Sequence, residues 1–250
     1  MTRLVQRLSH MTELPFSPSR MALLLDFDGT LVDIAPTPDS VVVPAGLVDD
    51  LLCLKKRLGG ALAIITGRPI AQIDHFLPGI PHAVAGEHGV ALRRAPDVAA
   101  VHASLPEIHA AWLEEADETA ARYPGVHVER KRAGLVLHYR GAPGAEQALR
   151  EMTSRWGVER YGFGVQEAKM ALELRPDGVD KGQAVRRVME EMPFRGRLPV
   201  FVGDDVTDMD GVLAARELGG AGWLIPDDFP DAASFREWLH KLAEDKRWNV

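Results

Sequence analysis

Cysteine is almost absent from this chain: Cys53 is the only one among 250 residues, so no disulfide can form within it. Cys53 lies in the apolar run 51–54, which is typical of a small core residue. The chain also lacks an apolar stretch long enough to span a bilayer, and Arg3 and Arg7 are not followed by the apolar segment of a secretory signal. We therefore expect a cytoplasmic protein that does not bind membranes.

Positive charge is also scarce. The 29 Lys and Arg face 36 Asp and Glu, for a formal net charge of −7, and this balance disfavours a general nucleic-acid binder. It does not exclude a small anionic substrate, because a few well-placed cations can serve one phosphate. No repeat or low-complexity segment stands out, and nothing in the sequence sets the oligomeric state, for which we expect a monomer or a weak homo-oligomer.

Short, continuous apolar runs recur along both ends of the chain. Such runs are typical of strands buried on both faces of a parallel sheet, and helical patterns lie between them, as at 46–58, where the acids come early and the bases late. The alternation predicts an α/β fold with a doubly wound parallel sheet. The strands are expected at 21–25, 61–65, 82–85, 198–202 and 221–225.

The middle of the chain has a different pattern, with helices and strand pairs in the order αββαββ. This order is typical of an antiparallel α+β fold, so we expect a smaller inserted domain at 95–178, a discontinuous core at 21–94 and 179–250, and a lead-in at 1–20. The elements expected in the insert are helices at 104–122 and 145–156, strands at 126–129 and 135–139, and two short strands within 162–174.

Polar residues that can carry chemistry follow the ends of the expected parallel strands, where open α/β sheets bind ligands. The first group is the segment Asp26 to Thr30. Asp26 could attack phosphorus as a nucleophile, and Asp28 could give a proton to the leaving oxygen and later remove one from water. The alternative is an acidic turn in which Gly29 makes the bend.

The next two groups could bind an anion. Thr66 and Gly67 precede a helix that Pro69 would begin, and a hydroxyl with backbone N–H groups at a helix start can bind phosphate; the alternative is that Thr66 only caps that helix. Lys181 is expected in the first turn of a helix that runs to about Glu191, where the dipole disfavours a cation by ~0.3–1 kcal/mol. The alternative there is a solvated surface lysine, and local features do not decide between the two.

The fourth group, Gly203 to Asp208, places three acids at the end of a buried strand. They repel one another unless a cation is present, and oxygen ligands of this kind are typical of an Mg²⁺ site. A solvated acidic helix cap is the alternative, above all for Asp208.

Taken together, these groups resemble the four ordered signatures of the haloacid dehalogenase (HAD) superfamily of phosphatases. The resemblance implies a HAD-like Rossmannoid core with an α+β cap, Asp26 as the catalytic nucleophile and Asp28 as the general acid/base. It also implies phosphate binding by Thr66, Gly67 and Lys181. Mg²⁺ would be held by the Asp26 carboxylate, the Asp28 backbone carbonyl and Asp204, with Asp205 or Asp208 in support.

Further segments resemble the trehalose-6-phosphate phosphatase family within that superfamily. They are 66–68, 86–89, 128–131, 137–140, 169–176, 180–182 and 203–208, so the resemblance spans most of residues 21–225. It implies hydrolysis of trehalose 6-phosphate in trehalose biosynthesis. Substrate contacts are implied for Arg68, His88, Glu129, Lys131 and Glu173.

Several readings remain open from the sequence alone. Met209 stands where the family commonly has an acid, and Glu129 could instead form a cross-strand ion pair. A related phosphatase could act on another sugar phosphate, such as a glucosyl- or mannosyl-phosphoglycerate or sucrose phosphate. A phosphorylated receiver domain would not need Asp28 or a large insert, whereas a sugar-phosphate mutase could also use Asp26 and Asp28.

Overall fold

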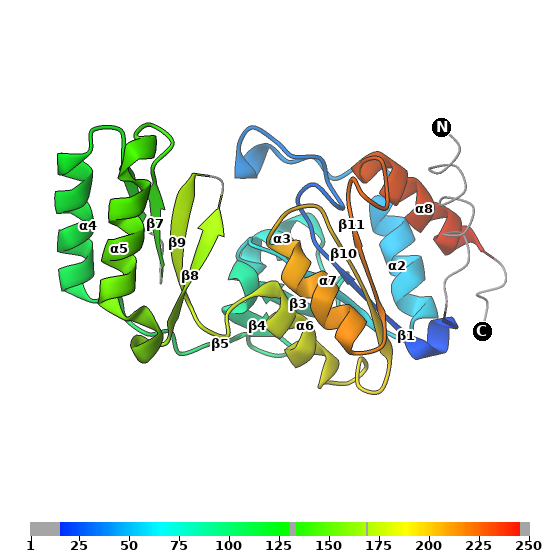
Figure 1. Ribbon diagram of the computed structural model, residues 1–250. Helices are drawn as coiled ribbons and strands as arrows, with labels where there is room; N and C mark the ends of the chain where they lie inside the picture. The colour runs from blue at the N-terminus through cyan, green and yellow to red at the C-terminus, as the bar shows by residue number, and fades with distance from the viewer. Residues whose placement is uncertain (1–15, 131–133, 169, 246–250) are drawn as a thin grey trace. The chain divides into compact units, whose positions relative to one another are not determined.

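The computed structural model describes residues 16–130, 134–168 and 170–245 (Figure 1). The chain divides into two compact units. The first runs as far as Ala103 and resumes at Asp180, and the second is Ser104–Val179. Within the described residues, no helix combines the length and the apolar character that crossing a membrane requires.

The first unit is built on a seven-stranded sheet in the order β11-β10-β1-β2-β3-β4-β5. The five strands from β11 to β3 are parallel, and β4 and β5 are antiparallel to their neighbours. The strands are β1 (Met21–Leu25), β2 (Leu62–Ile65), β3 (Ala83–Gly86), β4 (Ala91–Arg93), β5 (Val101–His102), β10 (Leu198–Gly203) and β11 (Ala221–Leu224).

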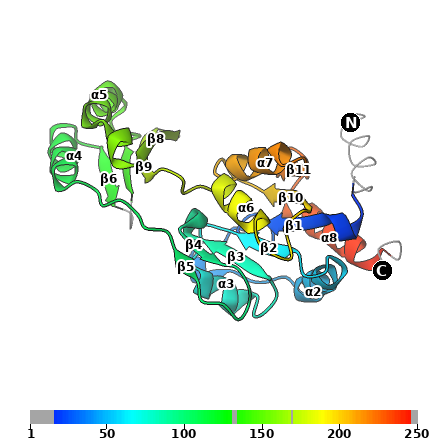
Figure 2. The ribbon, with the colours of Figure 1, turned by 90° about the horizontal axis from the view of Figure 1, so that it is seen from below.

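Helices cover both faces of this sheet. In Figure 2, α6 and α7 lie on one face and α2, α3 and α8 on the other. All five residues of β1 are buried, as the apolar run predicts for a central strand of a doubly wound sheet. The helices are α2 (Leu47–Arg57), α3 (Ile70–Phe76), α6 (Lys181–Met189), α7 (Asp208–Glu217) and α8 (Ala232–Glu244), with short 3-10 turns at η1 (Pro18–Arg20), η2 (Pro38–Ser40) and η3 (Glu87–Gly89).

The second unit is a four-stranded antiparallel sheet in the order β6-β7-β9-β8. Its core joins Trp112, Leu137 and Leu149, and Trp112 stacks on Trp156 with ring centroids 5.5 Å apart. The elements are α4 (Ala110–Arg122), β6 (His127–Arg130), β7 (Leu135–His138), η4 (Pro143–Ala145), α5 (Glu146–Trp156), η5 (Val158–Tyr161), β8 (Phe163–Ala168) and β9 (Ala171–Pro176).

The predicted fold class, a doubly wound α/β sheet with a smaller α+β part, is confirmed. The second unit begins at Ser104 rather than at residue 95. The reason is that β5 pairs with β4 and so extends the sheet of the first unit. At the other end the unit closes at Val179, one residue beyond the expected 178.

Candidate active site

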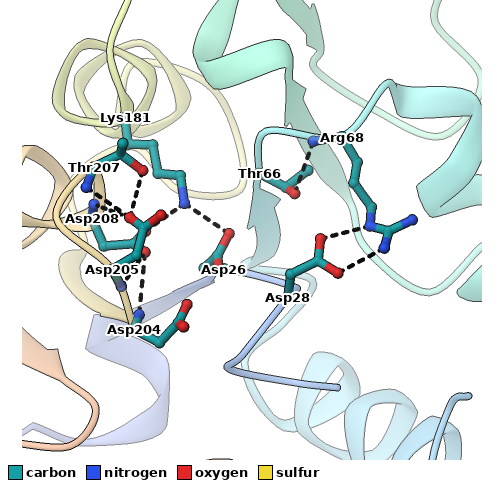
Figure 3. A network of polar contacts seen from close by, with 9 residues as sticks. All are labelled: Asp26, Asp28, Thr66, Arg68, Lys181, Asp204, Asp205, Thr207 and Asp208. Carbon is teal, nitrogen blue, oxygen red and sulfur yellow. Dashed lines mark hydrogen bonds and ion pairs between the residues drawn. The ribbon is translucent and has the colours of Figure 1, made fainter. Parts of the chain in front are cut away.

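A cavity of about 530 Å³ opens at the carboxyl ends of the parallel strands in the first unit, where such folds bind ligands. Asp26 follows β1, Thr66 follows β2 and Asp204 follows β10, so residues far apart in the sequence meet there (Figure 3). The lining includes Asp26, Asp28, Thr66, Gly67, Arg68, His88, Lys181, Asp204 and Asp205.

Asp26 is buried, with 3% of its surface exposed. Its backbone N–H donates to the Val202 carbonyl at 2.9 Å, which continues the β1–β10 ladder by one residue and fixes the base of the side chain. Burial raises the pKa of Asp26 well above its usual range, Lys181 opposes this change, and Asp208 adds to it. The carboxylate therefore needs positive charge beside it to stay ionised.

Lys181 supplies that charge. It is the first residue of α6, whose N-cap Asp180 accepts a hydrogen bond from the Gln183 N–H at 2.7 Å. Its Nζ donates to Asp26 Oδ1 at 2.9 Å and to Asp208 Oδ1 at 2.6 Å. Burial alone would lower the pKa of Lys181, but the two carboxylates outweigh burial and raise it. The unfavourable position in the first helical turn is thus offset by two buried ion pairs.

The acidic turn after β10 is held together by its own carboxylates. Asp208 Oδ2 accepts from the N–H groups of Asp204 at 3.2 Å and Asp205 at 3.1 Å. Asp205 Oδ1 accepts from the Thr207 N–H at 2.7 Å and from its hydroxyl at 2.6 Å. Gly203 leaves room for this turn, because an added Cβ would lie 2.2 Å from Asp208 Cγ. Asp208 is therefore a buried part of the site and not a solvated helix cap.

The acids at this site fit a hard divalent cation. Carboxylate oxygens of Asp26, Asp204 and Asp208 lie within 4.8 Å of one another. Burial, with help from Asp208 and Asp205, raises the pKa of Asp204 to about 6, so the cluster is strained by negative charge that a cation would offset. Asp205 differs: burial would raise its pKa, but the hydrogen bonds from Thr207 lower it below the usual range.

Asp28 faces away from Lys181 and pairs with Arg68. The guanidinium donates from Nε to Asp28 Oδ2 at 2.6 Å and from Nη2 to Oδ1 at 2.7 Å, a bidentate pair with fixed geometry. Nη1 donates to Gln72 Oε1 at 3.0 Å, and the guanidinium carbon lies 5.4 Å from the ring centroids of Phe27 and Phe76. Arg68 is thereby held in one place and orients Asp28 (Figure 3).

Thr66, Gly67 and His88 also line the cavity. Thr66 Oγ1 accepts from the Arg68 N–H at 3.1 Å, and α3 has no side-chain cap, so the alternative that Thr66 caps this helix is wrong. His88 has φ +57°, and its N–H donates to the Thr66 carbonyl at 3.0 Å. A Cβ on Gly67 would lie 2.7 Å from His88 Nε2, so only glycine lets this ring lie against the loop.

The trehalose-phosphatase family model matches residues 24–221. The chain belongs to this family. It is 36% identical over 251 residues to the trehalose-6-phosphate phosphatase of Escherichia coli K12, covering 96% of this chain and 94% of that one. A probable trehalose-phosphate phosphatase of Sinorhizobium fredii is 40% identical over 212 residues, covering 84% and 79% of the two chains.

Solved structures agree with this assignment to the trehalose-phosphatase family. The Aspergillus fumigatus trehalose-6-phosphate phosphatase superposes with a TM-score of 0.69 at 26% identity, over 96% of this chain and 95% of that one. A haloacid dehalogenase-like hydrolase from Bacteroides thetaiotaomicron superposes with a TM-score of 0.54 at 14% identity, over 89% and 99% of the two chains, and shares the fold.

Two of the residues that the sequence predicts to bind the sugar lie on the sheet of the second unit. Glu129 on β6 and Glu173 on β9 both stand opposite Val136 of β7, one on each side of it. They therefore share one face of the sheet. Lys131 lies outside the described residues.

Sequence reasoning missed the ion pair between Asp28 and Arg68. The resemblance of Thr66-Gly67-Arg68 to the family pattern marked Arg68 as a ligand for substrate, and nothing in the sequence indicated that it also binds Asp28. The pairing depends on how β2 and β1 end relative to one another, which only the folded sheet fixes.

Proposed function

We propose that this protein hydrolyses trehalose 6-phosphate to trehalose and inorganic phosphate, with Asp26 as the nucleophile and Mg²⁺ as cofactor. Membership of the trehalose-phosphatase family supports the substrate. The observation that carries the chemistry is the buried Asp26 carboxylate, bonded to Lys181 at 2.9 Å and grouped with Asp204 and Asp208. A buried acid kept ionised by one lysine is suited to nucleophilic attack on phosphorus.

In the first half-reaction, a carboxylate oxygen of Asp26 attacks the phosphorus of the substrate. A bond forms between that oxygen and phosphorus as the bond from phosphorus to the sugar oxygen breaks. Asp28 gives its proton to the departing oxygen, so trehalose leaves as a neutral alcohol. Arg68 orients Asp28 in the structure, and the protonated form needed for this step requires that the bidentate pair loosens when substrate enters.

In the second half-reaction, water attacks the phosphorus of the aspartyl phosphate. Asp28 removes a proton from the water, the bond between phosphorus and the Asp26 oxygen breaks, and inorganic phosphate leaves. Lys181 stays beside Asp26 through both halves, so the carboxylate is returned in its charged form.

The Mg²⁺ ion would be held by Asp26, Asp204 and the backbone carbonyl of Asp28, with Asp208 or Asp205 in support. When bound, the ion would neutralise phosphate charge and draw electrons from phosphorus. Asp208 belongs to the close cluster, and Asp205 lines the cavity. Both carboxylates already accept hydrogen bonds within the protein, so either is proposed as the supporting acid.

The remaining contacts would be divided between the two parts of the substrate. The phosphoryl oxygens would bind Lys181, the Thr66 hydroxyl and the Gly67 N–H. The disaccharide hydroxyls need both donors and acceptors, and a set of mixed charge provides them. That set is Arg68, His88, Glu129, Lys131 and Glu173.

The test is phosphate release from trehalose 6-phosphate with Mg²⁺, with EDTA, and with Mg²⁺ restored after EDTA. We expect multiple turnovers, loss on chelation and recovery. Sucrose 6-phosphate and glucosyl-3-phosphoglycerate serve as comparison substrates in the same assay. Equal rates on all three substrates would contradict the assignment of trehalose 6-phosphate as the specific substrate but leave the mechanism in place. Equal activity in EDTA and in Mg²⁺ would contradict the proposed metal requirement.

A further inference from the structure

The sheet of the second unit has two unlike faces. Along β7, Leu135 and Leu137 join the core together with side chains of α4 and α5, so the alternation of a strand places Val136 and His138 on the other face. Figure 2 shows both helices on one side of this sheet. Glu129 stands opposite Val136 and therefore shares this open face with His138.

His138 binds Glu129 directly. Its Nε2 lies 2.9 Å from Glu129 Oε2. An ionised carboxylate can only accept, so the histidine donates from a protonated Nε2. Because Glu129 is opposite Val136 and His138 is two residues further along β7, the bond runs diagonally across the two strands. It draws the Glu129 side chain along the strand and fixes the direction of its carboxylate.

A second histidine supports the first. His127 stands opposite His138 in the ladder, and the two rings stack with centroids 5.9 Å apart and planes 26° from parallel. Stacking limits rotation of the His138 ring. His127, His138 and Glu129 thus form a row in which each side chain holds the next, and Glu129 is the last of them.

The solvent exposure of these side chains argues against a purely stabilising role for this row. The side chains of His138 and Glu129 are 40% and 46% exposed, and exposed pairs of this kind add little to stability. The same bond matters more if Glu129 must meet a ligand, because a carboxylate that is already oriented loses less freedom on binding.

We propose that His138 is a positioning residue that orients Glu129 for the sugar hydroxyls of the substrate, with His127 as its support. This inference rests on the proposed function, since it takes Glu129 to contact the sugar. His138 itself acts through Glu129 and not on the phosphoryl group.

The experiment measures kcat and KM for His138→Leu, His138→Gln, Glu129→Gln and the double variant His138→Leu/Glu129→Gln. Trehalose 6-phosphate is one substrate, and p-nitrophenyl phosphate, a phosphate ester without a sugar, is the other. We expect His138→Leu to raise KM for trehalose 6-phosphate by about fivefold with kcat little changed. His138→Gln keeps an N–H donor at the same reach and should restore KM. His138→Leu and His138→Gln should hydrolyse p-nitrophenyl phosphate as the wild type does.

The double variant separates positioning from a structural role. If His138 acts through Glu129, then adding His138→Leu to Glu129→Gln raises KM no further. Multiplied effects would overturn the proposal, as would an unchanged KM in His138→Leu or an equal loss on both substrates. A matched control is Glu167→Gln, which removes the same charge from the opposite face, where Glu167 binds Arg150; its KM should not change.

The outcome also distinguishes the two proposals. A wild type that releases phosphate from p-nitrophenyl phosphate but not from trehalose 6-phosphate would overturn the proposed substrate and this inference with it. A wild type active on trehalose 6-phosphate, with His138→Leu unaffected, would overturn this inference alone.

Discussion

Asp26 has one cation and two acids as neighbours, and these neighbours act on its pKa in opposite directions. Burial raises the pKa of Asp26, and Lys181 opposes that rise. Lys181 also bonds Asp208, so the lysine divides its charge between the proposed nucleophile and a carboxylate that organises the acidic turn. Losing Lys181 would leave two buried acids without their cation, which is far more damaging than losing an exposed ion pair.

We predict that Asp26→Asn abolishes phosphate release, with a fall in kcat of about a thousandfold or more, since an amide cannot act as the nucleophile. The fold should persist, because the amide oxygen can still accept from Lys181 and one repelling charge is removed. Phosphate release and thermal unfolding by circular dichroism measure the two effects. Activity near that of the wild type would exclude Asp26 as nucleophile.

Gly29 permits Asp204 to approach Asp26. It has φ +73°, and an added Cβ would lie 2.0 Å from Asp204 Oδ2. We predict that Gly29→Ala lowers the free energy of unfolding and weakens Mg²⁺ binding, as measured by urea denaturation and calorimetry. Gly79→Ala is the matched control, with φ +69° and nothing within 4 Å of the new Cβ; left-handed strain alone should cost it about 1–2 kcal/mol. Equal losses in both variants, with Mg²⁺ affinity intact, would contradict this account.

The sequence allowed part of the site to be predicted. Asp26, Lys181 and Asp204 each follow or begin an element that an apolar pattern marks, so their meeting at one sheet edge was expected. The two roles of Asp208 were not predicted: it accepts hydrogen bonds from two backbone N–H groups and also from Lys181. This arrangement depends on the conformation of a turn, and a run of acids fits many turns.

Among elements, buried strands were predicted best and short edge strands worst. β1 is Met21–Leu25, as the apolar run indicated, because a central strand has an apolar side chain at every position. β5 has two residues, both exposed, and so leaves no pattern. α8 was missed although its signals exist, since Asp231 caps it by accepting from the Ser234 N–H at 2.7 Å and its buried positions follow helical spacing.

α8 packs beside α2, and a histidine links the two helices. His240 Nδ1 lies 3.0 Å from Asp50 Oδ1, and the hydrogen bond and charge of Asp50 raise the pKa of His240. A raised folded-state pKa means that the pair stabilises the protein below the unfolded pKa of 6.5 and that this contribution is lost as pH rises through the raised value.

We therefore predict that the wild type loses stability relative to His240→Gln between about pH 6 and pH 8. Urea unfolding of both proteins at the two pH values measures the difference. A difference that stays constant, or that grows with pH, would show that the pair does not contribute in this way.

At the scale of the whole molecule, every acid proposed to hold Mg²⁺ belongs to the first unit. A ligand that binds only the folded state stabilises what it contacts, by about 2.7 kcal/mol at a hundredfold excess over Kd. We predict that Mg²⁺ slows hydrogen exchange at the ends of β1 and β10 and leaves the second unit unchanged. Mass spectrometry of exchange with Mg²⁺ and with EDTA measures this. No protection at β1 and β10, or equal protection throughout, would contradict the site.

The close packing of Gly203 against Asp208 identifies a position that a directed-evolution library should leave unchanged. A Cβ at Gly203 would lie 2.2 Å from Asp208 Cγ, so we expect substitutions at this position to give inactive variants. The open face of the second-unit sheet tolerates change because its side chains are partly exposed. A library that seeks a new sugar preference should therefore vary that face, with Gln166, opposite Glu173, as first choice, and leave the glycines around the acids fixed.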